Sequence, residues 1–168
     1  MKTAKLIILP GVFTALLIGV QLVLSGVAGV ELVTILLLCF CYQYGVKQGM
    51  LVANAFSLLR CFVFGFYPNV LILYLVYYNI FAIAFGLLGK SWNATYTIKR
   101  HTLVLVTALF FTGLFTLLDD VITPLMSSFT WQQTKVYALA SLTTMIPQLI
   151  CTAVTTLVLF RPLIKIFK

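Results

Sequence analysis

Charged side chains are scarce in this sequence: Lys, Arg, Asp and Glu together make up 8% of its 168 residues, whereas hydrophobic residues make up 62%. A water-soluble domain ordinarily carries about 25% charged residues. The chain therefore has too little polar surface to enclose a water-soluble globule, and most of its surface must face lipid. Its length is that of one domain, so we expect residues 1–168 to form a single all-α domain embedded in a membrane.

Acidic residues and histidine are scarcer still, and the complete set is Glu31, Asp119, Asp120 and His101. So few groups provide no nucleophile–base pair and no cluster of metal ligands. The two adjacent aspartates lie about 100° apart on a helix and do not easily face one site. The four cysteines all lie in apolar runs, without metal-ligand or redox spacing. We therefore expect neither an enzyme nor a metal or cofactor site.

One short stretch resembles a nucleotide-binding motif. "AFGLLGKS" (84–91) matches the loose pattern of a phosphate-binding P-loop, which needs a strand before it and a helix after it. A long apolar run typical of a helix precedes the stretch instead, and no acidic residue remains for the second motif of an ATPase. We interpret Gly86 and Gly89 as a helix end and Lys90 as an anchor at the membrane surface.

Apolar runs of about 20 residues, the length that a membrane-spanning helix needs, recur along the chain. Turn signals and polar stretches separate them, among them "SGVAG" (25–29), "YGVKQG" (44–49), "GFYPN" (65–69) and "TPLMSSFTWQQTK" (123–135). The first run is longer than a signal-peptide core and lacks an A-x-A site, so we expect it to be retained. The sequence predicts six spans, at 6–26, 30–44, 46–66, 70–88, 102–122 and 136–160.

Basic residues are unevenly distributed between the two sides of these six spans. An even number of spans puts both termini on one side, where nine Lys and Arg residues fall, against Lys135 alone in a loop on the other side. An excess of basic residues marks the cytoplasmic side, so we expect both termini in the cytoplasm. This topology accounts for the net charge of +8. Nucleic acid is not an expected partner, because the basic residues form no stripe with interleaved aromatics.

Arg60 lies within the third predicted span, about five residues from its outer end. An arginine at membrane depth is costly and by default marks a functional site. A guanidinium inside the bundle would suit a carboxylate or phosphate on a solute. The alternative is that Arg60 extends to the outer headgroups and contacts no solute.

Other polar and aromatic residues near the predicted outer end complete a candidate solute site. A polar stripe on the sixth span, at 141, 144, 148, 152 and 155, should face the bundle interior, either to line the site or only to bond neighbouring helices. Aromatic residues of the fourth span more often pack a core or face lipid than line a ligand site, and those of the outer loops are either lid residues or membrane anchors. Besides Arg60, the candidates are Glu31, Tyr67, Asn69, Tyr74, Trp131, Thr144 and Gln148.

Small residues recur every four positions in the first span, at Gly11, Ala15 and Gly19. They share one side of a helix, and such stripes allow a second helix to approach closely in lipid. The stripe either packs within the same bundle or docks a partner membrane protein.

The stretch "MKTAKLIILPGVFTALLIGVQLVLS" is similar to the first helix of the substrate-binding S components of energy-coupling factor (ECF) vitamin transporters, which carries a small-xxx-small motif, here Ala15-xxx-Gly19. Residues 30–59 resemble the second helix, a cytoplasmic turn containing Gly45 and Gly49, and the third helix. "LILYLVYYNIFAIAFGLLGK" resembles the fourth helix. The likeness is best over residues 5–90, and the first outer loop (26–30) is shorter than in many members.

The resemblance implies a six-helix protein of a prokaryotic cell membrane that binds a vitamin-like solute near the outer surface. It also implies docking, through the first-helix motif, onto a transmembrane coupling protein driven by two cytoplasmic ATPase subunits. The ATP sites would then lie in partner chains. The rival interpretation is a structural or assembly membrane protein that binds no solute and packs through the small-residue stripe.

Overall fold

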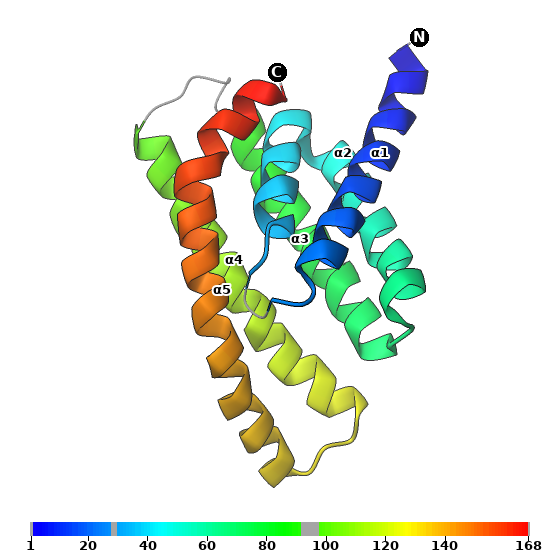
Figure 1. Cartoon of the computed structure of the whole chain (residues 1–168), viewed down its shortest axis with the longest axis vertical. Helices are drawn as coiled ribbons and strands as arrows, with labels where there is room; N and C mark the ends of the chain where they lie inside the picture. Colours follow the sequence, from blue (N-terminus) through cyan, green and yellow to red (C-terminus); the bar gives the residue numbers. More distant parts are fainter. Residues whose placement is uncertain (1, 28–29, 92–97, 168) are drawn as a thin grey trace.

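The computed structural model describes residues 2–27, 30–91 and 98–167, and within these ranges the chain is helical (Figure 1). The helices in these ranges are α1 (Lys2–Leu24), α2 (Val33–Phe64), α3 (Pro68–Ser91), α4 (Ile98–Met126) and α5 (Trp131–Ile166). Each contains an apolar segment long enough to cross a bilayer. The prediction of an all-α fold is confirmed for the described residues, and the long apolar helices indicate a multi-pass membrane protein.

Helix α2 reverses direction at Gly45, which has φ +81° and ψ 178°, a non-helical conformation that favours glycine. A straight helix of its 32 residues would be about 48 Å long, yet its first and last residues, Val33 and Phe64, line one cavity. Figure 1 shows the first half of α2 running toward one end of the bundle and the second half running back. The predicted segments 30–44 and 46–66 thus meet at Gly45 within one helical element. The helical part of the first segment, residues 33–44, is only about 18 Å long.

The glycines of "AFGLLGKS" bring α3 into backbone contact with the turn of α2. A Cβ atom on Gly86 would lie 2.6 Å from the backbone nitrogen of Val46, and one on Gly89 would overlap the carbonyl oxygen of Tyr42. Helix α3 continues through both glycines and ends at Ser91, two residues after Gly89. These glycines are present because the two backbones approach too closely for any side chain.

We expect Gly89→Ala to destabilise the protein, because the added methyl group would displace the backbone of the α2 turn. Overpacking of this kind costs about 1–3 kcal/mol, which corresponds to a melting temperature lower by several degrees at about 2–4 °C per kcal/mol. Gly113→Ala in α4 is the matched control, since a Cβ there meets nothing within 4 Å. Melting curves of the two variants in detergent provide the measurement, and equal stability would contradict the close approach.

An aromatic cluster forms the centre of the core, where α3 packs between α2 and α4. Ring centroids are 5.4 Å apart for Phe56 and Tyr78 and 5.5 Å apart for Phe81 and Phe111. The fourth-span aromatics at 74, 78, 81 and 85 are all buried. Their interpretation as core residues is therefore confirmed, although Tyr74 also contributes to the cavity described below.

The polar stretch 123–135, predicted as a loop, is mostly helical, because α4 extends to Met126 and α5 begins at Trp131. The prediction was wrong because Thr130 and Gln133 form a capping box that starts α5 early. The Thr130 amide donates to Gln133 Oε1 at 2.8 Å. Helix α5 has 36 residues and is about 54 Å long, and the α4–α5 hairpin projects beyond the other helices (Figure 1).

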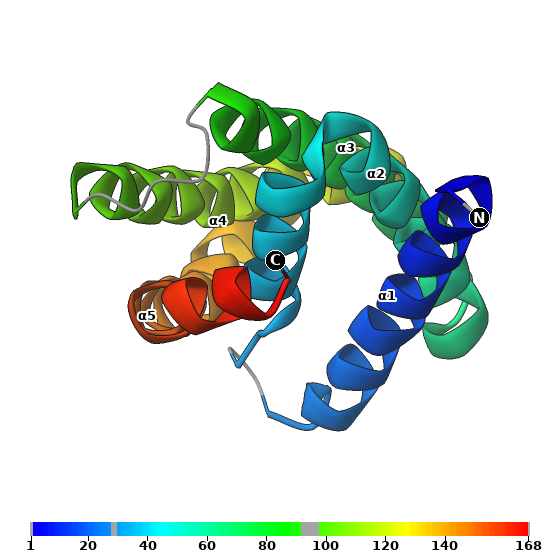
Figure 2. The same cartoon turned by 90° about the horizontal axis from the view of Figure 1, so that it is seen from above.

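Helix α1 begins and α5 ends at the same end of the bundle, opposite the α4–α5 hairpin (Figure 1). Figure 2, which looks down on the bundle, shows α1 at its edge beside α2, its main packing partner. One side of α1 is therefore left uncovered by the rest of the described chain.

Candidate functional site

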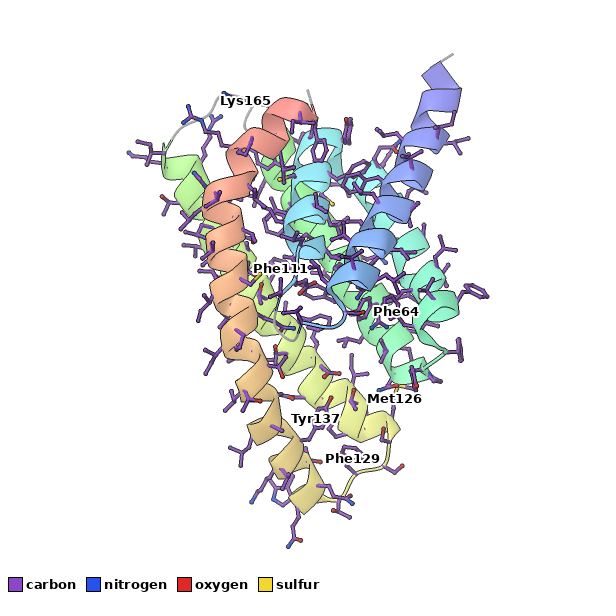
Figure 3. All side chains as sticks on the ribbon, in the orientation of Figure 1. Phe64, Phe111, Met126, Phe129, Tyr137 and Lys165 are labelled. Carbon is purple, nitrogen blue, oxygen red and sulfur yellow. The ribbon has the colours of Figure 1, made fainter. Side chains whose placement is uncertain are left out.

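A cavity of about 380 Å³ lies where all the described helices meet, and Phe64, labelled in Figure 3, stands on its wall. This volume falls within the range of small-molecule sites, about 300–1,000 Å³. Four of the eight predicted site residues line it: Glu31, Arg60, Tyr74 and Gln148. Residues from α2, α3 and α5 and from the segment that precedes α2 are thus brought together as expected. Among the other lining residues, which the sequence interpretation missed, are the polar Gln21 and the aromatic Phe64 and Phe115.

Arg60 provides the positive charge of this cavity. Its guanidinium carbon lies 4.4 Å from the ring centroid of Tyr74 and 5.2 Å from that of Phe64, so the cation stacks between aromatic rings. The residue is partly exposed, but its Nε is buried and has no hydrogen-bond partner among the described residues. A buried donor without a partner is costly. The side chain is thus directed into the bundle with an unused donor.

Gln21, near the C-terminal end of α1, lines the same cavity. Its Nε2 donates to the Tyr74 hydroxyl at 3.4 Å, whereas its Oε1 is buried and has no partner among the described residues. A single glutamine in an otherwise apolar stretch of helix was the signal that would have identified it, because polar side chains inside a membrane helix usually face the interior.

Glu31 precedes α2 and is held in place from two sides. The Thr34 hydroxyl donates to Glu31 Oε1 at 3.1 Å, and the Glu31 backbone amide and carbonyl each lie 3.4 Å from the Cys151 sulfur on α5. Glu31 and Arg60 both line the cavity. The cavity therefore carries one cation and one acidic group.

A second cavity of about 260 Å³ adjoins the first, sharing Phe115 and Gln148 with it. Thr144, a predicted site residue, lines this second cavity together with Asp119 and Tyr137. Asp119 Oδ2 accepts a hydrogen bond of 2.7 Å from the Tyr137 hydroxyl, so its carboxylate joins α4 to α5.

The adjacent aspartates serve different contacts, as their separation on a helix predicts. Asp119 lines the second cavity, whereas Asp120 Oδ2 accepts from Ser141 at 2.9 Å. The polar stripe of α5 continues inward with Thr152, which lies 3.1 Å from Thr112 through their hydroxyls. Within the described residues, no group of three or more His, Cys, Asp or Glu side chains could hold a metal ion.

Three predicted site residues lie away from both cavities. Tyr67 is exposed, and Asn69, predicted in an outer loop, lies in the first turn of α3 and donates to the Thr123 hydroxyl at 3.2 Å. Trp131 begins α5 and is 72% exposed, with the Lys135 ammonium 5.1 Å from its ring centroid. Tyr67 and Asn69 lie at the connection between α2 and α3 and Trp131 at the start of α5. The positions of Tyr67 and Trp131 at helix ends fit aromatic anchors at a membrane surface.

The small-residue stripe lies on the uncovered side of α1. Gly11, Ala15 and Gly19 are all exposed, and a Cβ built on either glycine meets nothing within 4 Å. The stripe therefore does not pack within the described part of the bundle, which leaves it available to another helix.

Comparison of the chain with known proteins found no matching family model, no matching curated protein and no matching solved structure. The features of the chain that bear on its function are the cavity, the exposed stripe and the arrangement of the helices.

Proposed function

We propose that the chain is the S component of an ECF-type transporter, which captures a vitamin-like small solute from outside the cell for ATP-driven import. The observation that carries the proposal is the cavity at the meeting point of the helices, where the buried Nε of Arg60 and Oε1 of Gln21 have no partner in the described chain. The size of the cavity and the few polar side chains in its apolar lining, among them Glu31, Arg60 and Gln148, favour a small ligand. The proposed role requires no chemistry in this chain, since ATP would be hydrolysed by partner subunits.

The proposed topology has six spans with both termini in the cytoplasm of a prokaryotic cell. The reversal of α2 at Gly45 supports it, because the reversal divides one helical element into two membrane segments. Basic residues support the orientation: Lys165, labelled in Figure 3, lies at the end of the bundle where α1 begins and α5 ends. Lys90 in the last turn of α3 and Lys47 beside the α2 turn line a pocket together. This distribution fits the positive-inside pattern.

A labelling experiment tests this orientation. With the four native cysteines replaced, a single cysteine at Lys99 should resist membrane-impermeant maleimide in intact cells, and one at Lys135 should react. Both residues are exposed, so a difference in reactivity reflects the side of the membrane. Rapid labelling at 99 from outside would contradict the proposed topology.

The proposed partners are a transmembrane coupling protein and two cytoplasmic ATPase subunits. The exposed stripe at Gly11, Ala15 and Gly19 supports such docking, since small residues allow close contact between helices in lipid. The same stripe would also serve a structural or assembly protein, which is the alternative function. The cavity is the feature that favours solute capture over the structural or assembly role, since an assembly protein needs no solute site.

Native mass spectrometry of the protein purified from its own membrane distinguishes the two proposals. An S component should retain a small molecule, seen as an added mass that disappears on collisional activation. An assembly protein should show only the bare chain and lipid. Lipid is recognised by masses that vary with the acyl chains, so a single invariant added mass supports solute capture. Its absence would contradict the proposed function.

A further inference from the structure

We infer that the pocket between the α2 turn and the end of α3 binds the phosphate headgroup of an anionic phospholipid, with an acyl chain of this lipid lying along the exposed side of α3. The pocket has a volume of about 500 Å³ and shares no lining residue with the Arg60 cavity. Lipid binding there is therefore a property separate from solute capture and does not depend on it.

The lining of this pocket carries positive charge without negative charge. Lys47 and Lys90 line it from α2 and α3, and both residues are exposed, so a ligand can reach them. The acidic residues of the chain are Glu31, Asp119 and Asp120, and none of them lines the pocket. Basic pockets between membrane helices bind phosphate-bearing headgroups. A zwitterionic headgroup would bring a cation of its own next to the lysines, so an anionic headgroup fits better.

Close backbone contact fixes the two walls of the pocket against each other. Gly86 and Gly89 belong to its lining, and a Cβ atom on either would clash with the backbone around the α2 turn. The Tyr44 hydroxyl donates to the Phe167 carbonyl oxygen at 3.1 Å, so the turn lies beside the C-terminal end of α5 (Figure 1). The pocket is thus a built feature of one end of the bundle, at the level where helix ends meet lipid headgroups.

An exposed apolar stripe on α3 leads to this pocket. Its members lie within about 80° of one another around the helix, and they are Ile72, Val76, Ile80, Ile83 and Leu87. Lys90 lies on the same side, about five turns from Ile72, and Leu87 also lines the pocket. The stripe is about 22 Å long, which exceeds half of a hydrocarbon core of about 30 Å. It can therefore hold one acyl chain of a lipid whose phosphate lies beside Lys90, whereas a soluble phosphate compound would leave it unused.

Native mass spectrometry of the full-length protein released from nanodiscs tests lipid binding. The nanodiscs contain equal amounts of phosphatidylglycerol and phosphatidylcholine with the same acyl chains. The unaltered protein should retain one phosphatidylglycerol in preference to phosphatidylcholine by about tenfold or more, as expected for two lysines beside an anionic headgroup. Glycerol phosphate, which has the phosphate but no acyl chain, should not displace this lipid at about 10 mM, a concentration that reveals weak ligands.

A pair of matched double variants assigns the retained lipid to the pocket. Lys47→Gln and Lys90→Gln together should lower retention of phosphatidylglycerol about tenfold or more. Lys99→Gln and Lys165→Gln together are the control, since both lysines are exposed, lie near the start of α4 and the end of α5, and do not line the pocket. The control removes the same charge from the same end of the bundle and should change retention by less than about twofold.

The absence of a preference for phosphatidylglycerol in the unaltered protein would overturn the inference, and this comparison needs no variant. Equal losses in the two double variants would overturn it as well, because they would show diffuse attraction to the membrane surface. Displacement by glycerol phosphate would assign the pocket to a soluble phosphate compound instead. Full retention of lipid by the pocket variant, with loss of a co-purifying protein, would assign it to a protein partner. All these outcomes leave solute capture in the Arg60 cavity unaffected.

Discussion

Gly19→Leu should abolish solute import while leaving the isolated protein folded and able to bind solute. Gly19 is exposed on α1, and a Cβ there meets nothing within 4 Å, so a larger side chain has room in the isolated chain. A partner helix packed on the stripe would instead be pushed away. Overpacking a close helix–helix contact costs about 1–3 kcal/mol, and about 1.4 kcal/mol already weakens association tenfold. Ala15→Leu should act in the same direction.

Co-purification with the coupling protein and uptake into cells measure this effect, and melting in detergent reports the fold. Leu9→Phe is the matched control, because Leu9 is also exposed on α1 but lies about 80° to 160° around the helix from the three residues of the stripe. The control should leave complex formation within about twofold of the unaltered protein, as a surface substitution normally does. Unfolding of the isolated Gly19→Leu protein would show that the stripe is internal packing. Normal complex formation would remove the docking proposal.

Arg60→Met should weaken binding of the co-purified solute by about 2 kcal/mol or more, comparable to deleting a buried hydrogen bond from a charged group. Methionine keeps approximate bulk between the rings of Tyr74 and Phe64 but removes the donor and the charge. Arg60→Lys retains the charge and loses the planar donor fork, so a smaller loss of affinity is expected. Equilibrium binding to each variant provides the measurement.

Melting without solute separates a binding role for Arg60 from a structural one. Its Nε has no partner among the described residues, so Arg60→Met should cost little stability in the empty protein. Lys135→Met is the control for removal of a cation, since Lys135 lies over Trp131, away from both cavities. Unchanged solute affinity in a well-folded Arg60→Met protein would show that Arg60 is not part of the site. A large loss of stability without solute would show that it serves the fold.

Interactions within one helix were the most predictable features of the site. The polar stripe of α5 follows from helical periodicity, and Gln148 and Thr152 face the interior as expected. Arg60 could be identified because a charge in an apolar run is conspicuous. The loop at 123–135 was predicted wrongly because its polar composition outweighed the capping signal of Thr130 and Gln133.

The sequence by itself determined the class of protein and the positions of its apolar segments, because transfer of a side chain from water to lipid depends on that residue and its near neighbours. Only the tertiary structure decided which side chains share the cavity. Gln21 and Arg60 both meet Tyr74 because three helices cross there, and no local pattern encodes that crossing. The exposure of the α1 stripe was decided in the same way, since periodicity defines one face of a helix but not what covers it.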